Sequence, residues 1–134
     1  MCAASPGDSC YNSGVRTKEQ IVRDWLPRYT GRDLADFGEY ILLSNFGEYV
    51  ELFARRFGVE VVGRDKPMPS ASANNITMLN FGMGSAMAAT VMDLLAAVEP
   101  KAVLFLGKCG GLKKAKVGDF ILPIAAIRGE GTRN

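Results

Sequence analysis

Two glycines near the middle of the chain stand where backbone chemistry is possible. Gly82 and Gly84 follow an apolar, β-prone run at residues 76–81. A stretch rich in Ala, Met and Leu at residues 86–98 comes next, and Ser85 precedes it as a plausible helix N-cap. Because glycine tolerates positive φ, this spacing predicts a tight strand-to-helix turn. The N–H groups of such a turn, with the positive end of its helix, can hold an anion or a sugar hydroxyl.

A turn of this kind can also be a simple connection, and the spacing alone leaves that interpretation open. Neither of the common nucleotide fingerprints is matched. Met87 stands where a dinucleotide-binding motif has its third glycine, and the Gly-Lys-Ser/Thr ending of a P-loop is absent.

A second glycine turn follows the apolar run at residues 102–106. This run has the length of a strand and shows no polar alternation, which is typical of strands buried on both faces of a parallel sheet. In open α/β sheets, ligands usually sit at the carboxyl ends of the strands. The residues at this strand end are therefore candidates for ligand binding: Lys108, Cys109, Gly110 and Gly111.

Acid–base chemistry is restricted because the chain has no histidine. It must fall to carboxylates, lysine, tyrosine or cysteine, or to a residue outside this chain. Glu130, just after a predicted strand at residues 120–127, is the only carboxylate near the predicted pocket. The three cysteines, Cys2, Cys10 and Cys109, have no spacing typical of a disulfide framework or a zinc site, and they fit a reduced, cytoplasmic setting. Cys109 is interpreted as an inert buried thiol, since no base stands beside it.

Length and composition indicate one domain or part of one. The chain has 134 residues, an apolar share of 48% and a net charge of +2, so a core is possible and neither a nucleic-acid groove nor a membrane surface is indicated. No apolar run reaches the length of a membrane span, and no signal or transit peptide is recognised. Residues 1–15 are predicted to be a disordered tail, and residues 16–134 a domain.

Periodicity and turn residues predict an α/β fold with a mixed, mostly parallel sheet flanked by helices. We expect a helix at residues 17–29, which begins with a Thr17–Gln20 capping box and ends at Pro27 and Gly31. A second helix is expected at 48–57. A third is expected at 86–98, buried on most sides and stopped by Pro100. We expect strands at 40–43, 59–62, 76–81, 102–106 and 120–127, and a flap or linker at 70–73. The last strand would be left uncovered at the C-terminal side, so we expect a fragment or a chain that needs a partner.

Three segments together resemble a known family. Residues 76–90, 104–112 and 117–132 are similar to the nucleoside phosphorylase superfamily, and more closely to its AMP nucleosidase branch. The resemblance runs over residues 17–132, nearly the whole chain. It implies a nucleoside phosphorylase-like fold that is incomplete at the C-terminal side.

The resemblance implies hydrolysis of the N-glycosidic bond of AMP to adenine and ribose 5-phosphate by a homo-oligomer, usually a hexamer, without metal or other cofactor. It places the ribose beside Gly82, Met83, Gly84 and Ser85. It places the base and anion pocket at the turn that starts at Lys108, with three further residues nearby: Arg128, Glu130 and Thr132. The catalytic acid and the Met-Glu pair that holds the ribose are expected in a second half, which this chain lacks.

Two departures from the family pattern bear on the reaction. Phosphorylases of the superfamily carry an arginine where Phe105 stands and a Ser or Thr where Lys108 stands. Loss of the arginine removes a bidentate clamp for inorganic phosphate, which favours water as the attacking group. Lys108 could instead meet the 5′-phosphate of the substrate. Two alternatives stay open: a purine or uridine phosphorylase-type enzyme of the same superfamily, and a half-domain that only binds or assembles.

Overall fold

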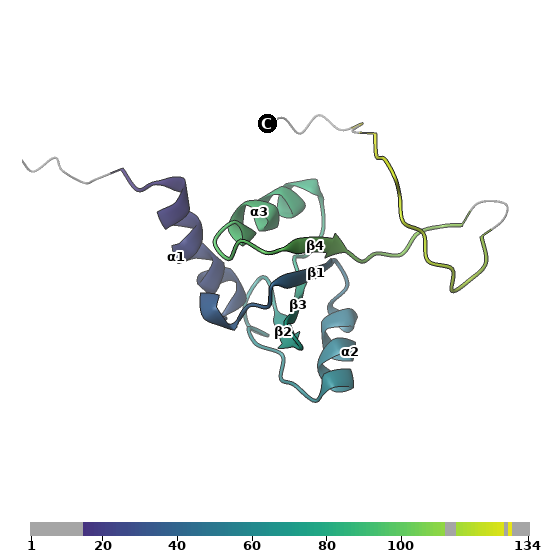
Figure 1. The fold of residues 1–134 in the computed structure, drawn as a ribbon, viewed down its shortest axis with the longest axis horizontal. Coiled ribbons are helices and arrows are strands. Elements are labelled where there is room, and N and C mark those ends of the chain that lie inside the picture. The colour runs from purple at the N-terminus through teal and green to yellow at the C-terminus, as the bar shows by residue number, and fades with distance from the viewer. Residues whose placement is uncertain (1–14, 112–114, 128, 130–134) are drawn as a thin grey trace, which may run out of the picture.

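The computed structural model describes residues 15–111, 115–127 and 129 (Figure 1). Along the chain the elements are α1 (Lys18–Thr30), a short 3-10 helix η1 (Leu34–Asp36), β1 (Tyr40–Ser44), α2 (Gly47–Phe57), β2 (Ser70–Ala73), β3 (Ile76–Asn80), α3 (Ser85–Leu95) and β4 (Ala102–Phe105). Among these described residues, no helix is both long enough and apolar enough to cross a membrane.

The four strands form one mixed sheet in the order β2-β3-β1-β4. The central strand β1 pairs in parallel with both neighbours, so Leu42 lies opposite Met78 on β3 and Leu104 on β4. The hairpin strand β2 pairs antiparallel with β3. This arrangement confirms the predicted α/β class, and it brings the carboxyl ends of β3, β1 and β4 to one edge, called here the carboxyl edge. The opposite edge is called the amino edge.

Helices cover both faces of the sheet. Helices α1 and α3 lie on one face and α2 lies on the other (Figure 1). Alternate residues of β1 serve the two layers: Ile41 and Leu43 belong to the core under α1 and α3, and Leu42 packs against the cluster under α2. Period-two alternation of this kind is what a strand with two covered faces requires.

Helix α1 begins as the sequence predicts. Thr17 and Gln20 form a reciprocal capping box, and Gly31 ends the helix in the left-handed conformation with a φ of 69°. The prediction that Pro27 helps to end the helix is wrong, because Pro27 lies inside it. Its carbonyl accepts the Gly31 N–H at 2.7 Å, so Pro27 takes part in the C-terminal cap.

The segment between α2 and β3 differs from the prediction. Residues 59–62 form no strand, and only Val62 makes an isolated bridge, to Ser70. The segment predicted as a flap or linker is instead the edge strand β2, in which Ser70 and Ala71 are fully buried. Arg32 secures this strand, since its Nε donates to Ser70 Oγ at 3.0 Å and its Nη2 to Ser70 O at 3.3 Å. Burial of the guanidinium lowers the pKa of Arg32.

Helix α3 is less buried than its composition predicts. It ends at Leu95, and residues 96–98 form a turn before Pro100. Val91, Leu94 and Leu95 face the core, but Met92 is 50% exposed. The helix is therefore apolar on a face that no other described residue covers.

Of the last two predicted strands, the one at 102–106 forms and the one at 120–127 does not. Strand β4 forms, but Leu104 and Phe105 are about half exposed, so the prediction of burial on both faces is wrong. The reason is that β4 pairs only with β1 and lies at the edge of the sheet. Residues 120–127 form no strand, and Phe120 is 95% exposed. An apolar run becomes a strand only when a neighbouring strand takes up its N–H and C=O groups, and no described strand lies beside this one.

Candidate functional site

The turn from β3 to α3 lies at the carboxyl edge and has the predicted conformation. Gly82 and Gly84 have φ values of 81° and 98°. Asn80 Oδ1 accepts the Gly82 N–H at 3.1 Å and so fixes the first bend. Gly84 is the N-cap and Ser85 is the first helical residue, so the prediction of Ser85 as N-cap is wrong. Met83, between the glycines, is 77% exposed.

A mainly apolar hollow of about 410 Å³ opens beside this turn. It lies between the head of α3 and the ends of β1, β3 and β4, and its lining residues are Leu43, Asn45, Phe81, Gly84, Ser85, Ala88, Met92 and Phe105. Phe81 and Phe105 meet edge to face with their ring centroids 5.8 Å apart. Asn45 Oδ1 is buried and has no hydrogen-bond partner among the described residues. An apolar wall with one available amide acceptor suits a flat or sugar-like ligand that carries an N–H or O–H donor.

The turn from β1 to α2 also ends at the carboxyl edge. Ser44 Oγ accepts the Phe46 N–H at 3.1 Å, which holds the turn. Phe46 is the N-cap of α2 and provides no side-chain cap. Its ring lies 5.5 Å from that of Tyr49, and the Lys108 ammonium lies over both, 4.7 Å from the Phe46 centroid and 5.6 Å from the Tyr49 centroid. A cation within about 6 Å of a ring face is attracted by the ring quadrupole.

The remaining residues of the second glycine turn are exposed. Cys109, Gly110 and Gly111 continue from Lys108 without regular structure. Cys109 is a free and exposed thiol, so the interpretation of a buried cysteine is wrong. The chain leaves the sheet at the open edge of β4 here, and no described residue covers the thiol.

The predicted site residues thus gather at one edge but not in one hollow. Gly84 and Ser85 line the hollow on the α3 side, whereas Lys108 rests on the head of α2, which covers the other face. A single pocket that joins the two turns stays a prediction. The other predicted residues, Arg128, Glu130 and Thr132, lie outside the described residues, as do Cys2 and Cys10.

Sequence reasoning missed three residues at this edge: Asn45, Phe46 and Tyr49. It interpreted the segment after the first strand only as a turn. The signal was present nonetheless, because the loop after a parallel strand lies where ligands of α/β sheets bind. Among residues 15–111, 115–127 and 129, no group of three or more Cys, Asp or Glu side chains could hold a metal ion.

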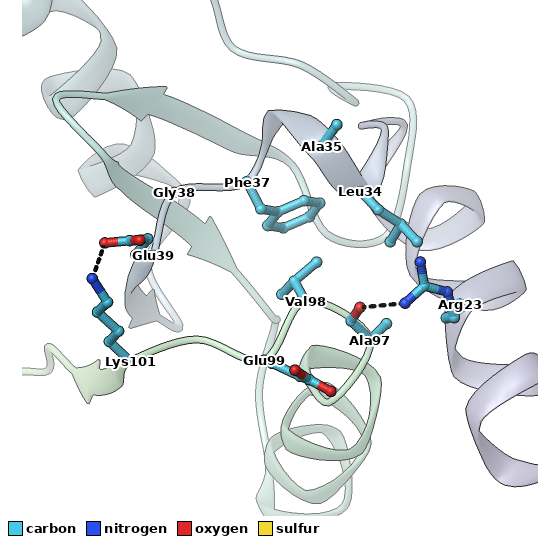
Figure 2. A pocket seen from close by; sticks show the side chains of 10 residues that line it. All are labelled: Arg23, Leu34, Ala35, Phe37, Gly38, Glu39, Ala97, Val98, Glu99 and Lys101. Atoms are coloured by element: carbon cyan, nitrogen blue, oxygen red, sulfur yellow. Dashed lines mark hydrogen bonds and ion pairs between the residues drawn. The ribbon is translucent and has the colours of Figure 1, made fainter.

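A second hollow, of about 530 Å³, lies at the amino edge between η1, the end of α3 and α1 (Figure 2). Three of its charged side chains, those of Arg23, Glu39 and Lys101, bind one another or the backbone. Lys101 Nζ meets Glu39 Oε2 at 2.6 Å, and Arg23 Nη1 donates to Ala97 O at 3.4 Å. Asn75 Nδ2 also donates to Glu39 Oε2, at 2.9 Å.

These contacts shift the titration of the ion pair. The hydrogen bond from Lys101, and then that from Asn75, hold the pKa of Glu39 below its ordinary value. The same bond to Glu39 raises the pKa of Lys101. Glu39, Lys101 and Arg23 of the amino-edge hollow therefore already have partners within the chain.

Comparison with known proteins adds sequence and structural relatives. The family model described as the phosphorylase superfamily matches residues 33–134. The chain is 27% identical over 141 residues to the AMP nucleosidases of Escherichia coli K12 and of Escherichia coli O157:H7, covering 77% of this chain and 29% of each relative. The crystal structure of AMP nucleosidase from Bacteroides thetaiotaomicron VPI-5482 superposes with a TM-score of 0.80 at 62% identity, over 87% of this chain and 50% of that one. The chain thus spans less than a third of the curated relatives and half of the solved one.

Proposed function

This chain belongs to the phosphorylase superfamily, and we propose that it forms the sugar- and phosphate-binding half of an enzyme that hydrolyses AMP to adenine and ribose 5-phosphate. The observation that carries the proposal is the 62% identity with a solved AMP nucleosidase over 87% of the chain. The match to the family model, over residues 33–134, includes the sheet, and the carboxyl edge is where ligands of such sheets bind.

The chemistry of the edge supports water as the nucleophile. Phosphorolysis needs a held inorganic phosphate, which a bidentate arginine clamps well. Phe105 stands where phosphorylases of the superfamily have that arginine, and its ring packs on Phe81 instead of offering a charge. An apolar group at this place gives inorganic phosphate no clamp.

Each side of the edge has its own part in the proposed reaction. Cleavage of the glycosidic bond builds oxocarbenium character on the ribose and negative charge on the departing base. The turn at Gly82 and Gly84 holds the ribose at the head of α3, with the Asn45 amide oxygen as an acceptor in the hollow. Lys108 faces the 5′-phosphate. The acid that protonates the base comes from outside the described residues.

The proposal extends to assembly and location. Half-exposed apolar residues such as Trp25 and Met92 support a homo-oligomer. The resemblance to the superfamily favours a hexamer for a full-length protein of the same length as the solved relative. Cysteines without disulfide spacing support a cytoplasmic setting. The proposed reaction uses no metal or other cofactor.

The test is phosphate dependence. The gene product that contains residues 1–134 is incubated with AMP in buffer free of phosphate, and adenine and ribose 5-phosphate are measured by chromatography. We expect equal amounts of both products, with no increase when inorganic phosphate is added. Release of adenine only with phosphate would indicate a phosphorylase. No turnover of any nucleoside or nucleotide by a protein that still assembles would indicate a binding or assembly half-domain, and either result would overturn the proposal.

A further inference from the structure

Lys108 is held by two aromatic rings from another part of the fold. Phe46 and Tyr49 belong to the head of α2, and Lys108 follows β4, so the contact forms only when β4 pairs with β1. The distances of 4.7 Å and 5.6 Å from the ammonium to the two ring centroids place it over both faces. Phe46, Tyr49 and Lys108 are called here the lysine–aromatic cluster.

Rings hold a cation without neutralising it. Lys18, Lys66 and Lys101 each pair with a carboxylate, whereas Lys108 takes part in none of the ion pairs among the described residues. A carboxylate partner would compete with an incoming anion for the ammonium. Ring faces attract the ammonium through their quadrupole and leave its full charge available.

The position of the cluster adds to this charge. Helix α2 begins beside it at Gly47 without a side-chain cap, so the positive end of the helix dipole lies at the same place. The acidic residue of the first helical turn is Glu48, which is exposed to solvent. The helix dipole therefore adds a positive contribution beside Lys108, which the solvent-exposed Glu48 carboxylate offsets in part.

Resting on the proposed function, we propose that Phe46 and Tyr49 are positioning residues. They hold the Lys108 ammonium ready for the 5′-phosphate of AMP and so favour the nucleotide over the nucleoside. A lysine side chain is long and flexible, and it loses rotamer freedom when it binds a ligand. Rings that fix it beforehand remove part of that loss, so they increase affinity only for ligands that carry the phosphate.

The first test compares AMP with adenosine. Phe46→Leu and Tyr49→Leu remove a ring face and keep apolar bulk, whereas Tyr49→Phe keeps the face and is the matched control. We expect each leucine variant to raise KM for AMP about threefold and to leave KM for adenosine unchanged. Tyr49→Phe should stay within about twofold of wild type for both. Circular dichroism and thermal melting establish that each variant folds.

A double-mutant cycle separates positioning from a structural role. Lys108→Met keeps the stem and removes the charge, and we expect KM for AMP to rise about tenfold, as for the loss of a hydrogen bond to a charged group. In the Lys108→Met background, Phe46→Leu should have no further effect, because the ring acts through the ammonium. Additive losses, or equal losses for AMP and adenosine, would overturn the proposal.

A binding measurement keeps this proposal separate from the proposed function. Ribose 5-phosphate and ribose are titrated by calorimetry into wild type, Phe46→Leu and Lys108→Met. Weaker binding of ribose 5-phosphate alone in both variants supports the cluster, even if the protein proves not to hydrolyse AMP. If the protein hydrolyses AMP but neither variant changes the affinity for ribose 5-phosphate, the proposed function stands and the positioning role of the lysine–aromatic cluster is rejected.

Discussion

The amino edge and the carboxyl edge of the sheet differ in whether their polar groups have partners within the chain. At the amino edge, Glu39 binds Lys101 and Asn75, and Gly38 N–H donates to the buried Thr77 hydroxyl at 2.8 Å. At the carboxyl edge, the described residues provide no partner for Asn45 Oδ1 and no carboxylate for Lys108, whose ammonium lies over two ring faces.

This difference indicates that the polar groups of the amino edge stabilise the fold, whereas those of the carboxyl edge are available to bind a ligand. Buried polar groups are normally satisfied within a protein, so the buried Asn45 acceptor without a partner among the described residues is notable at a strand end. The amino-edge hollow is the larger of the two, yet three of its charged side chains, those of Arg23, Glu39 and Lys101, already have partners. Volume alone would favour the amino edge. The expectation from α/β sheets and the chemistry of the lining both favour the carboxyl edge.

Gly38→Ala should give the largest effect on stability. A Cβ on Gly38 would lie 2.3 Å from Asn75 O and 2.7 Å from Ile76 N, which are backbone atoms of the β2–β3 hairpin and the start of β3. Such an overlap forces the amino edge apart, and we expect a loss of about 3 kcal/mol in the free energy of unfolding. Urea denaturation followed by circular dichroism measures it.

Gly47→Ala is the matched control at the carboxyl edge. Its Cβ would make an ordinary contact, 3.5 Å from Asn80 Nδ2, at the first position of α2. Alanine is a better helix former than glycine, so stability should stay the same or rise by up to about 1 kcal/mol. A loss as large as that of Gly38→Ala would contradict the contrast between the two edges.

Gly84→Ala should have an intermediate effect on stability and a strong effect on binding. The φ of 98° and ψ of 156° at Gly84 belong to a region that essentially only glycine occupies, although no atom lies within 4 Å of a Cβ there. The strain should cost about 2 kcal/mol, or move the turn instead. In either case the affinity for ribose 5-phosphate should fall, as measured by calorimetry.

Gly110→Ala serves as its control at the same edge. Gly110 has open space around a Cβ and no positive φ, so its replacement should leave stability unchanged. If Gly84→Ala changed neither the stability nor the affinity for ribose 5-phosphate, the turn at the head of α3 would only connect β3 to α3.

Glu39→Gln should give the smallest effect on stability, present near neutral pH and lost at acidic pH. The folded state lowers the pKa of Glu39, so its contribution to stability is present above the unfolded pKa and is lost as pH falls through the folded pKa. Wild type should therefore exceed the variant at about pH 6 and approach it at about pH 3. The folded state raises the pKa of Lys101, so the contribution of Lys101 to stability disappears only at strongly alkaline pH.

Denaturation across this pH range measures the difference, and added salt should reduce it because both groups are exposed. Glu60→Gln, an exposed glutamate without an ion pair among the described residues, is the control. A difference between wild type and Glu39→Gln that did not change with pH would mean that the ion pair does not stabilise the fold.

Local signals in the sequence determined the parts of the fold that depend on near neighbours. The Thr17–Gln20 capping box, the glycine ends of α1 and α2, and the positive φ of Gly82 and Gly84 each depend on a few adjacent residues. The family resemblance was likewise readable from residue identity. One local signal was overlooked: Asn74 and Asn75 both adopt positive φ and form the hairpin turn that makes residues 70–73 a strand.

Only the tertiary structure decided which surfaces are covered and which distant groups meet. Residues 59–62 and 120–127 have the composition of strands, but a strand needs a partner, and the described chain provides none beyond one bridge. Helix α3 and β4 look buried in sequence and stay half exposed because they lie at the edge of the layers. Lys108 gained its ring contacts from a helix far away in the chain, and no local pattern encodes such a contact, because it depends on the order of strands in the sheet.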